Sequence, residues 1–233
     1  FDVHEPFHIP EPYESMYAEG ATKNEFNIWP PYQVYGDLAA FMDQTSPEEL
    51  KFLKSQFMGK VTMMDRWFGT LLDKLDELDL WDDTMVIFTT DHGHDLGERG
   101  AFGKQHPHFD SHANIPLMIW HPKAPGNGRR LSGLTQTVDL FATLIEAAEV
   151  EVTPDNRHSR SLLPMVTGNA PSPREAVLYG TFGQGVCATD GTWPILKAPD
   201  PNKPLFLSST SIFRPLIFHT PLPGPLPRAP YQP

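Results

Sequence analysis

The fold of this chain is decided by residues 85–93, whose sequence is MVIFTTDHG. The run is largely apolar and carries no charge before Asp91, so it predicts a strand buried on both faces, as parallel strands of α/β proteins are. The strand ends in a carboxylate, an imidazole and a glycine. In open α/β sheets, ligands bind beyond the carboxyl ends of the strands. The stretch therefore predicts an α/β core with a candidate metal site at this strand end.

The residues before this strand predict a long amphipathic helix. Residues 46–49, SPEE, combine a hydroxyl cap, a proline in the first turn and a glutamate at the capping-box position. Apolar residues then recur at spacings of three and four from Leu50 to Leu78, which predicts one apolar helix face. A helix that packs back onto the sheet before the next strand is the expected right-handed crossover. Residues 1 to about 45 lack any period and predict a long packed loop.

The residues after the strand continue the α/β pattern up to about residue 150, and the pattern then changes. Residues 115–120 predict a second strand, and 138–148 a second amphipathic helix. Beyond residue 150 we expect a short anchor at 161–164 and a small antiparallel sheet with a turn at Asp190-Gly191. The strands of that sheet are predicted at 176–179, 185–189 and 193–196.

Three regions follow from this pattern. Residues 1–150 are predicted to be the α/β core, residues 151–213 a small carboxy-terminal subdomain, and residues 214–233 a proline-rich, disordered tail. The chain begins on Phe1 and not on methionine, so we expect a piece of a longer protein.

Composition excludes several classes of function. The chain of 233 residues has 18 Lys and Arg against 29 Asp and Glu, a formal net charge of −11. Such a surface repels polyanions, so no nucleic-acid partner is expected. The single cysteine, Cys187, excludes an internal disulfide, and no apolar run reaches the length of a membrane span. The sequence is compatible with an oligomer and assigns no compartment.

Asp91 and His92 are the candidate metal ligands. Carboxylate oxygens suit Ca²⁺ or Mg²⁺, and imidazole nitrogens suit Zn²⁺, Mn²⁺ or similar ions. Gly93 would permit the backbone turn that lets two adjacent side chains bind one ion. The alternative is a helix-capping aspartate beside a surface histidine, and for an isolated Asp-His-Gly that alternative is the better one. The context of the motif reverses this preference.

Two further residues could meet an anionic substrate. Lys104 follows Gly97 and Gly103 in a loop that can fold back towards the strand end, and its ammonium can hold one oxygen of a sulfate or phosphate. His4 would point into the same crevice if its segment ends another strand, and could then protonate a leaving oxygen. A loop histidine bonded to backbone is an equally good interpretation of His4.

Residues 105–112, QHPHFDSH, hold three histidines and an aspartate. They could ligate a second metal, or they could form a polar loop that faces the substrate. We favour the loop, because Pro107 and the alternating spacing do not give a pair on one helix face. His108 is then a candidate substrate contact. Cys187, in a predicted strand without a neighbouring base, is interpreted as a small core residue.

Taken together, these motifs resemble those of the sulfatase family of the alkaline-phosphatase-like superfamily. The resemblance runs in order through roughly residues 1 to 200, which is far more specific than any one motif. The segments that carry it are 2–7, 64–72, 90–93, 96–98, 103–104, 115–117, 138–140, 161–164 and 189–191.

The resemblance implies a fold, a metal and roles for named residues. It implies the carboxy-terminal part of an alkaline-phosphatase-like α/β/α sandwich with a small antiparallel sheet. It implies a divalent cation, usually Ca²⁺, with Mn²⁺ or Mg²⁺ as alternatives, held partly by Asp91 and His92. Lys104 would contact the sulfate, and His4 would bind the ester and protonate the leaving group. The substrate would be a small sulfated or phosphorylated molecule.

Family members attack sulfur with a formylglycine made from the first residue of a Cys/Ser-x-Pro-x-Arg motif. That motif is absent from the sequence, so we expect the nucleophile upstream of Phe1 and an inactive chain without it. His92 stands where many sulfatases have asparagine, and histidine also occurs in relatives that cleave phosphonate or phosphate esters. Asn114 stands where sulfatases often have arginine. A sulfatase is therefore the first hypothesis, a phosphonate monoester or phosphodiester hydrolase the second, and an inert fragment the third.

Overall fold

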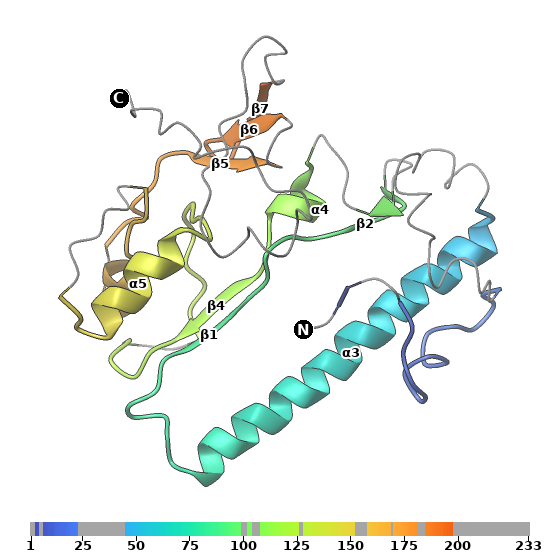
Figure 1. Ribbon diagram of the computed structural model, residues 1–233, viewed down its shortest axis with the longest axis horizontal. Helices are drawn as coiled ribbons and strands as arrows, with labels where there is room; N and C mark the ends of the chain where they lie inside the picture. Colours follow the sequence, from blue (N-terminus) through green and yellow to red (C-terminus); the bar gives the residue numbers. More distant parts are fainter. Residues whose placement is uncertain are drawn as a thin grey trace, which may run out of the picture.

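The computed structural model describes residues 3–4, 7–22, 45–98, 102–103, 108–125, 128–151, 158–168, 170–180 and 185–197. The first part mixes helices with short strands, and a small sheet closes the second (Figure 1). The elements are α3 (Pro47–Glu77), β1 (Val86–Thr89), β2 (Asp95–Leu96), β3 (Phe102–Gly103), α4 (Asp110–Ala113), β4 (Leu117–Trp120), α5 (Asp139–Ala147), α6 (Leu163–Thr167), β5 (Val177–Gly180), β6 (Val186–Thr189) and β7 (Pro194–Lys197).

Helix α3 begins where its capping residues predict. The Ser46 hydroxyl accepts from the Glu49 N–H at 3.2 Å, and the Glu49 carboxylate accepts from the Ser46 N–H at 2.8 Å. The predicted capping box is therefore confirmed. The apolar face of α3 is only partly covered by described residues, since Leu53 is buried against Phe7 while Leu71 is exposed.

Strand β1 departs from the prediction in its pairing. It was expected to be a parallel strand buried on both faces, but it pairs antiparallel with β4, with Val86 opposite Trp120 and Thr89 opposite Leu117. Within the described part of the chain β4 is its partner, and its residues are half-buried. An apolar run indicates that a strand is buried but not whether it pairs in parallel or antiparallel, which explains why the predicted direction is wrong. Figure 1 shows the β1–β4 ladder between α5 and α3, and Phe68 of α3 packs on Phe88 with ring centroids 4.9 Å apart.

The second part matches the predicted small antiparallel sheet. Strands β5, β6 and β7 form it in that order, and the Asp190-Gly191 turn joins β6 to β7. Cys187 is buried in β6, as predicted for a core residue. The anchor predicted at 161–164 is the start of α6, where Leu162 is fully buried. The boundary at residue 150 stays a prediction, and residues 214–233 lie outside the described ones.

None of the described helices combines the length and the apolar character needed to cross a bilayer.

Candidate active site

The loop after β1 carries the two candidate metal ligands. Asp91 is exposed on 85% of its side-chain surface and His92 on 39%. The Nε2 atom of His92 lies 3.7 Å from the Oδ2 atom of Asp91. Because metal–ligand bonds to nitrogen and oxygen are about 2.0–2.6 Å long, these two atoms can face one ion.

The His92 ring is oriented by its own backbone. Its Nδ1 atom lies 2.9 Å from the carbonyl oxygen of Gly93. A carbonyl only accepts, so Nδ1 carries the hydrogen and Nε2 presents its lone pair on the side of Asp91. Metal-bound histidines commonly donate their second N–H to a backbone carbonyl in this way. The donor set therefore fits a divalent cation.

The surroundings of Asp91 favour the charged form of its carboxyl group. Partial burial pulls its pKa upward, but the nearby His92 and hydrogen bonds to its carboxylate outweigh this effect. The donors include the backbone N–H of His92 at 3.0 Å and the hydroxyl of Thr90 at 3.3 Å. The pKa of Asp91 therefore lies below its usual value, and the ligand is anionic at neutral pH.

Gly93 has a different role from the one predicted. It does not adopt a left-handed conformation. A Cβ atom at this position would instead lie 1.8 Å from the backbone oxygen of Ser111. Glycine is required because α4 packs directly on the loop, where the Gly93 N–H donates to the His112 carbonyl at 2.9 Å.

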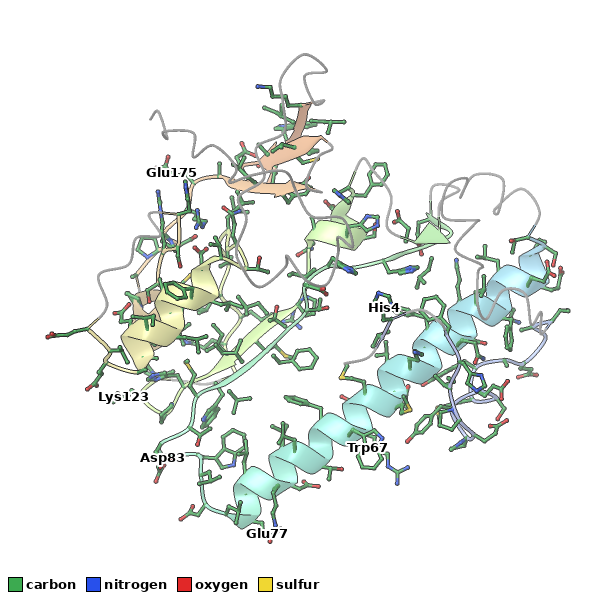
Figure 2. All side chains as sticks on the ribbon, viewed as in Figure 1. His4, Trp67, Glu77, Asp83, Lys123 and Glu175 are labelled. Atoms are coloured by element: carbon green, nitrogen blue, oxygen red, sulfur yellow. The ribbon has the colours of Figure 1, made fainter. Side chains whose placement is uncertain are left out.

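His4 lies beside the loop, although its segment is not a strand. Val3 has a φ of +63°, which is outside the extended region, so the strand expected here is not seen at the described residues 3–4. The ring centroid of His4 is nevertheless 6.4 Å from that of His92. Figure 2 shows His4 between α3 and the segment that leads from β1 to β2. Lys60 of α3 donates to the His4 carbonyl at 2.9 Å and so anchors its backbone.

A cleft of about 860 Å³ opens at the same loop. Its lining includes Asp91, His92 and His108 together with Gln136 and Tyr179. The small carboxy-terminal sheet therefore forms part of the cleft, and His108 faces it together with the candidate ligands. The predicted set of His4, Asp91, His92 and His108 thus gathers around one region.

Two expectations concern the residues after β3. Lys104 lies outside the described residues, so its role stays a prediction. Among the residues that the structure does describe, no three histidine, cysteine or carboxylate side chains are arranged to hold a metal. A second metal at residues 105–112 accordingly has no support from His108, Asp110 and His112.

The family model described as Sulfatase matches residues 2–150. The chain belongs to the sulfatase family. This match includes the core elements from α3 to α5 and the loop that carries Asp91 and His92.

Two similar curated proteins illustrate the match. The chain is 33% identical over 138 residues to the multifunctional alkaline phosphatase superfamily protein PehA of Trinickia caryophylli, covering 58% of this chain and 26% of that protein. It is 32% identical over 126 residues to N-acetylglucosamine-6-O-sulfatase of Bacteroides thetaiotaomicron, covering 53% and 22%. The chain thus spans about a quarter of the length of these curated relatives.

The fold is also shared with a solved structure. A phosphonate monoester hydrolase from Silicibacter pomeroyi superposes with a TM-score of 0.68 at 23% identity, covering 85% of this chain and 46% of that one. The predicted alkaline-phosphatase-like α/β class with a small antiparallel sheet is therefore confirmed.

Next to the Asp91–His92 loop the structure shows a contact that the sequence analysis did not predict, between the buried residues Asp95 and His112, although His112 belongs to the stretch 105–112 considered above for a second metal. Asp95, Ser111 and His112 form a cluster beneath the loop, with the Ser111 hydroxyl donating to the Asp95 carboxylate. The signal in the sequence is that Asp95 and His112 are polar residues that stand next to apolar ones in short elements. Local pattern does not reveal that β2 and α4 meet.

Proposed function

We propose that the full-length protein hydrolyses a sulfate ester, with Asp91 and His92 as part of its metal site. The observation that carries the proposal is the convergence of His4 on these two residues in a sulfatase-family core. Calcium is the ion we favour, with Mn²⁺ and Mg²⁺ as alternatives. A bound divalent cation would offset the negative charge of a sulfate oxygen and of the nucleophile.

The residues of this chain then have separate tasks. Asp91 and His92 present an oxygen and a nitrogen to the cation from one side of the cleft. His4, held at its backbone by Lys60, can give a proton to the bridging oxygen as the sulfur–oxygen bond breaks. Lys104 is proposed to contact a sulfate oxygen. His108, which lines the cleft, is proposed to contact the rest of the substrate.

The nucleophile is proposed to lie outside residues 1–233. A formylglycine, derived from a Cys/Ser-x-Pro-x-Arg motif, would serve the full-length protein, and no such motif occurs in the sequence. The substrate is proposed to be a small sulfated molecule, and the cleft volume of about 860 Å³ lies within the range typical of small-molecule sites. The similarity to N-acetylglucosamine-6-O-sulfatase makes a sulfated amino sugar the first substrate to assay.

Replacement of Asp91 tests the metal assignment. Asp91→Asn keeps the shape of the side chain but removes its charge, so we expect at least about a 100-fold loss of kcat/KM towards 4-nitrophenyl sulfate in the full-length protein. Calcium affinity, measured by titration calorimetry, should fall in parallel. Asp82→Asn, an exposed aspartate in the turn before β1, is the matched control. Unchanged activity and calcium affinity in Asp91→Asn would exclude Asp91 as a ligand.

A second function is favoured by one residue. Histidine at position 92, where many sulfatases carry asparagine, also suits a phosphonate monoester or phosphodiester hydrolase. The relative PehA is itself named as a multifunctional protein of the superfamily. Parallel assays with 4-nitrophenyl sulfate, 4-nitrophenyl phenylphosphonate and bis(4-nitrophenyl) phosphate separate the two. A kcat/KM for either phosphorus substrate at least tenfold above that for the sulfate would establish the second function.

A further inference from the structure

A buried polar cluster lies directly beneath the loop of the candidate metal site. Asp95 in β2 is completely buried and His112 in α4 is 4% exposed. The Oδ2 atom of Asp95 lies 3.7 Å from the Nδ1 atom of His112. Neither atom has a hydrogen-bond partner in the part of the chain that the structure describes. Buried polar atoms without partners are costly, so their presence here needs a reason.

The His112 ring bridges two strands. Its Nε2 atom lies 2.9 Å from the carbonyl oxygen of Gly103 in β3. Since that carbonyl only accepts, Nε2 is the donor, and Nδ1 is the atom that faces Asp95. The second oxygen of Asp95 accepts from the hydroxyl of Ser111. The ring is thus held against β3 on one side and next to the β2 carboxylate on the other.

The backbone of the same two α4 residues holds the metal loop. The His112 carbonyl accepts from the Gly93 N–H at 2.9 Å, and the Ser111 carbonyl accepts from the His94 N–H at 3.0 Å. Gly93 directly follows His92 and has no room for a side chain against Ser111. Any movement of Ser111 and His112 is therefore transmitted to the residue beside the candidate ligand.

We propose that the Asp95–Ser111–His112 cluster positions the Asp91–His92 loop for metal binding. His112 also lines the cleft, but no role in the chemistry proposed above is assigned to it or to Asp95 and Ser111. The three residues act on the loop through the backbone of residues 93 and 94. The proposal rests on the proposed function only in assigning metal binding to that loop. It differs from a general role in stability because the effect of losing the cluster is confined to the loop and to metal affinity.

Two replacements of His112 separate the contacts of its ring. Glutamine can place a donor near the position of Nε2, so His112→Gln keeps the bond to Gly103. Asparagine is too short and loses it. His121→Asn is the matched control, because His121 is also a buried histidine but lies beyond β4. Ser111→Ala is a milder second variant that removes one hydroxyl from Asp95.

Hydrogen–deuterium exchange in the full-length protein gives the first measurement. We expect peptides that contain residues 91–95 to exchange at least tenfold faster in His112→Asn and about threefold faster in Ser111→Ala. His112→Gln should approach the wild type, and peptides from α3 should not change in any variant. Equal exchange at 91–95 in all variants would overturn the proposal. Uniform acceleration across the protein would also overturn it, since that result indicates a purely structural role.

Titration calorimetry with CaCl₂ or MnCl₂ gives the second measurement. Partners that orient metal ligands typically contribute about 10–100-fold to affinity. We expect a loss of this size in His112→Asn, partial recovery in His112→Gln and no change in His121→Asn. An unchanged Kd in His112→Asn would contradict the proposal. If the wild type binds neither ion, the proposed metal function fails, and the exchange measurement alone decides whether the cluster positions the loop.

Discussion

His4 shows how one residue can be fixed at its backbone and still present its ring to a site. Lys60 is 5% exposed and donates to the His4 carbonyl, while the His4 ring lies close to that of His92. The backbone of His4 is therefore held beside the loop while its ring stays exposed. This arrangement suits a group that transfers a proton, because a general acid must be positioned and also reach the substrate.

The leaving group tests the role of His4. An aryl sulfate releases a stable phenolate that needs little protonation, whereas an alkyl sulfate releases a basic alkoxide. We expect His4→Gln to lower kcat for an alkyl sulfate by about 100-fold or more, and for 4-nitrophenyl sulfate by about tenfold or less. Equal losses for both substrates in the full-length protein would show that His4 binds substrate without donating a proton.

Replacement of Lys60 should lower kcat as replacement of His4 does, but by a smaller factor. Lys60→Met removes the donor to the His4 carbonyl and keeps the length of the side chain, so we expect a loss of about 3–10-fold in kcat for the alkyl sulfate and a smaller loss for the aryl sulfate. Lys74→Met on the same helix is the control, because Lys74 makes an exposed pair with Glu77. If both variants behave alike, the position of His4 does not depend on Lys60.

At the scale of elements, one ion pair joins α5 to the chain that leads into β5. Asp139 is completely buried at the first turn of α5, and both of its oxygens accept from the Arg174 guanidinium. The backbone N–H groups of Gln136 and Arg160 also donate to this carboxylate. Asp139 therefore ties the core helix to the carboxy-terminal segment whose sheet forms one wall of the cleft.

The pH dependence of stability should reveal this pair. Burial raises the pKa of Asp139, but the hydrogen bonds from Arg174 and the two backbone N–H groups outweigh it, so its pKa lies below the ordinary 3.8. A depressed pKa means that the stabilisation is complete above about pH 3.8 and is lost as the pH falls through the lower folded value.

Denaturant unfolding at several pH values measures the contribution of the Asp139–Arg174 pair. Asp139→Asn leaves Arg174 without its charge partner and should cost about 3–5 kcal/mol at pH 7. The difference between the wild type and this variant should shrink as the pH is lowered below about 3.8. A difference that stays constant across that range would show that the charge of Asp139 contributes nothing to stability.

At the scale of the whole molecule, the sequence predicted the elements better than their arrangement. The capping box at Ser46 and the Asp190-Gly191 turn depend on neighbours within a few residues, and both were predicted correctly. The antiparallel pairing of β1 with β4 and the contact of Asp95 with His112 join residues that are distant in sequence. No local periodicity encodes such contacts, so the candidate ligands could be named from the sequence but the cluster beneath them could not.

The proposed site needs a nucleophile motif that residues 1–233 do not contain, and this leads to a prediction about the chain alone. Residues 1–233 hold the proposed metal-binding loop and the proposed general acid, but they contain no Cys/Ser-x-Pro-x-Arg motif. Without a nucleophile, the metal and the acid can only polarise the ester. We therefore expect the purified 233-residue chain to show no turnover of 4-nitrophenyl sulfate, with or without added CaCl₂. Turnover that disappears in Asp91→Asn would place the nucleophile within these residues, whereas turnover that persists in that variant would come from a contaminating enzyme.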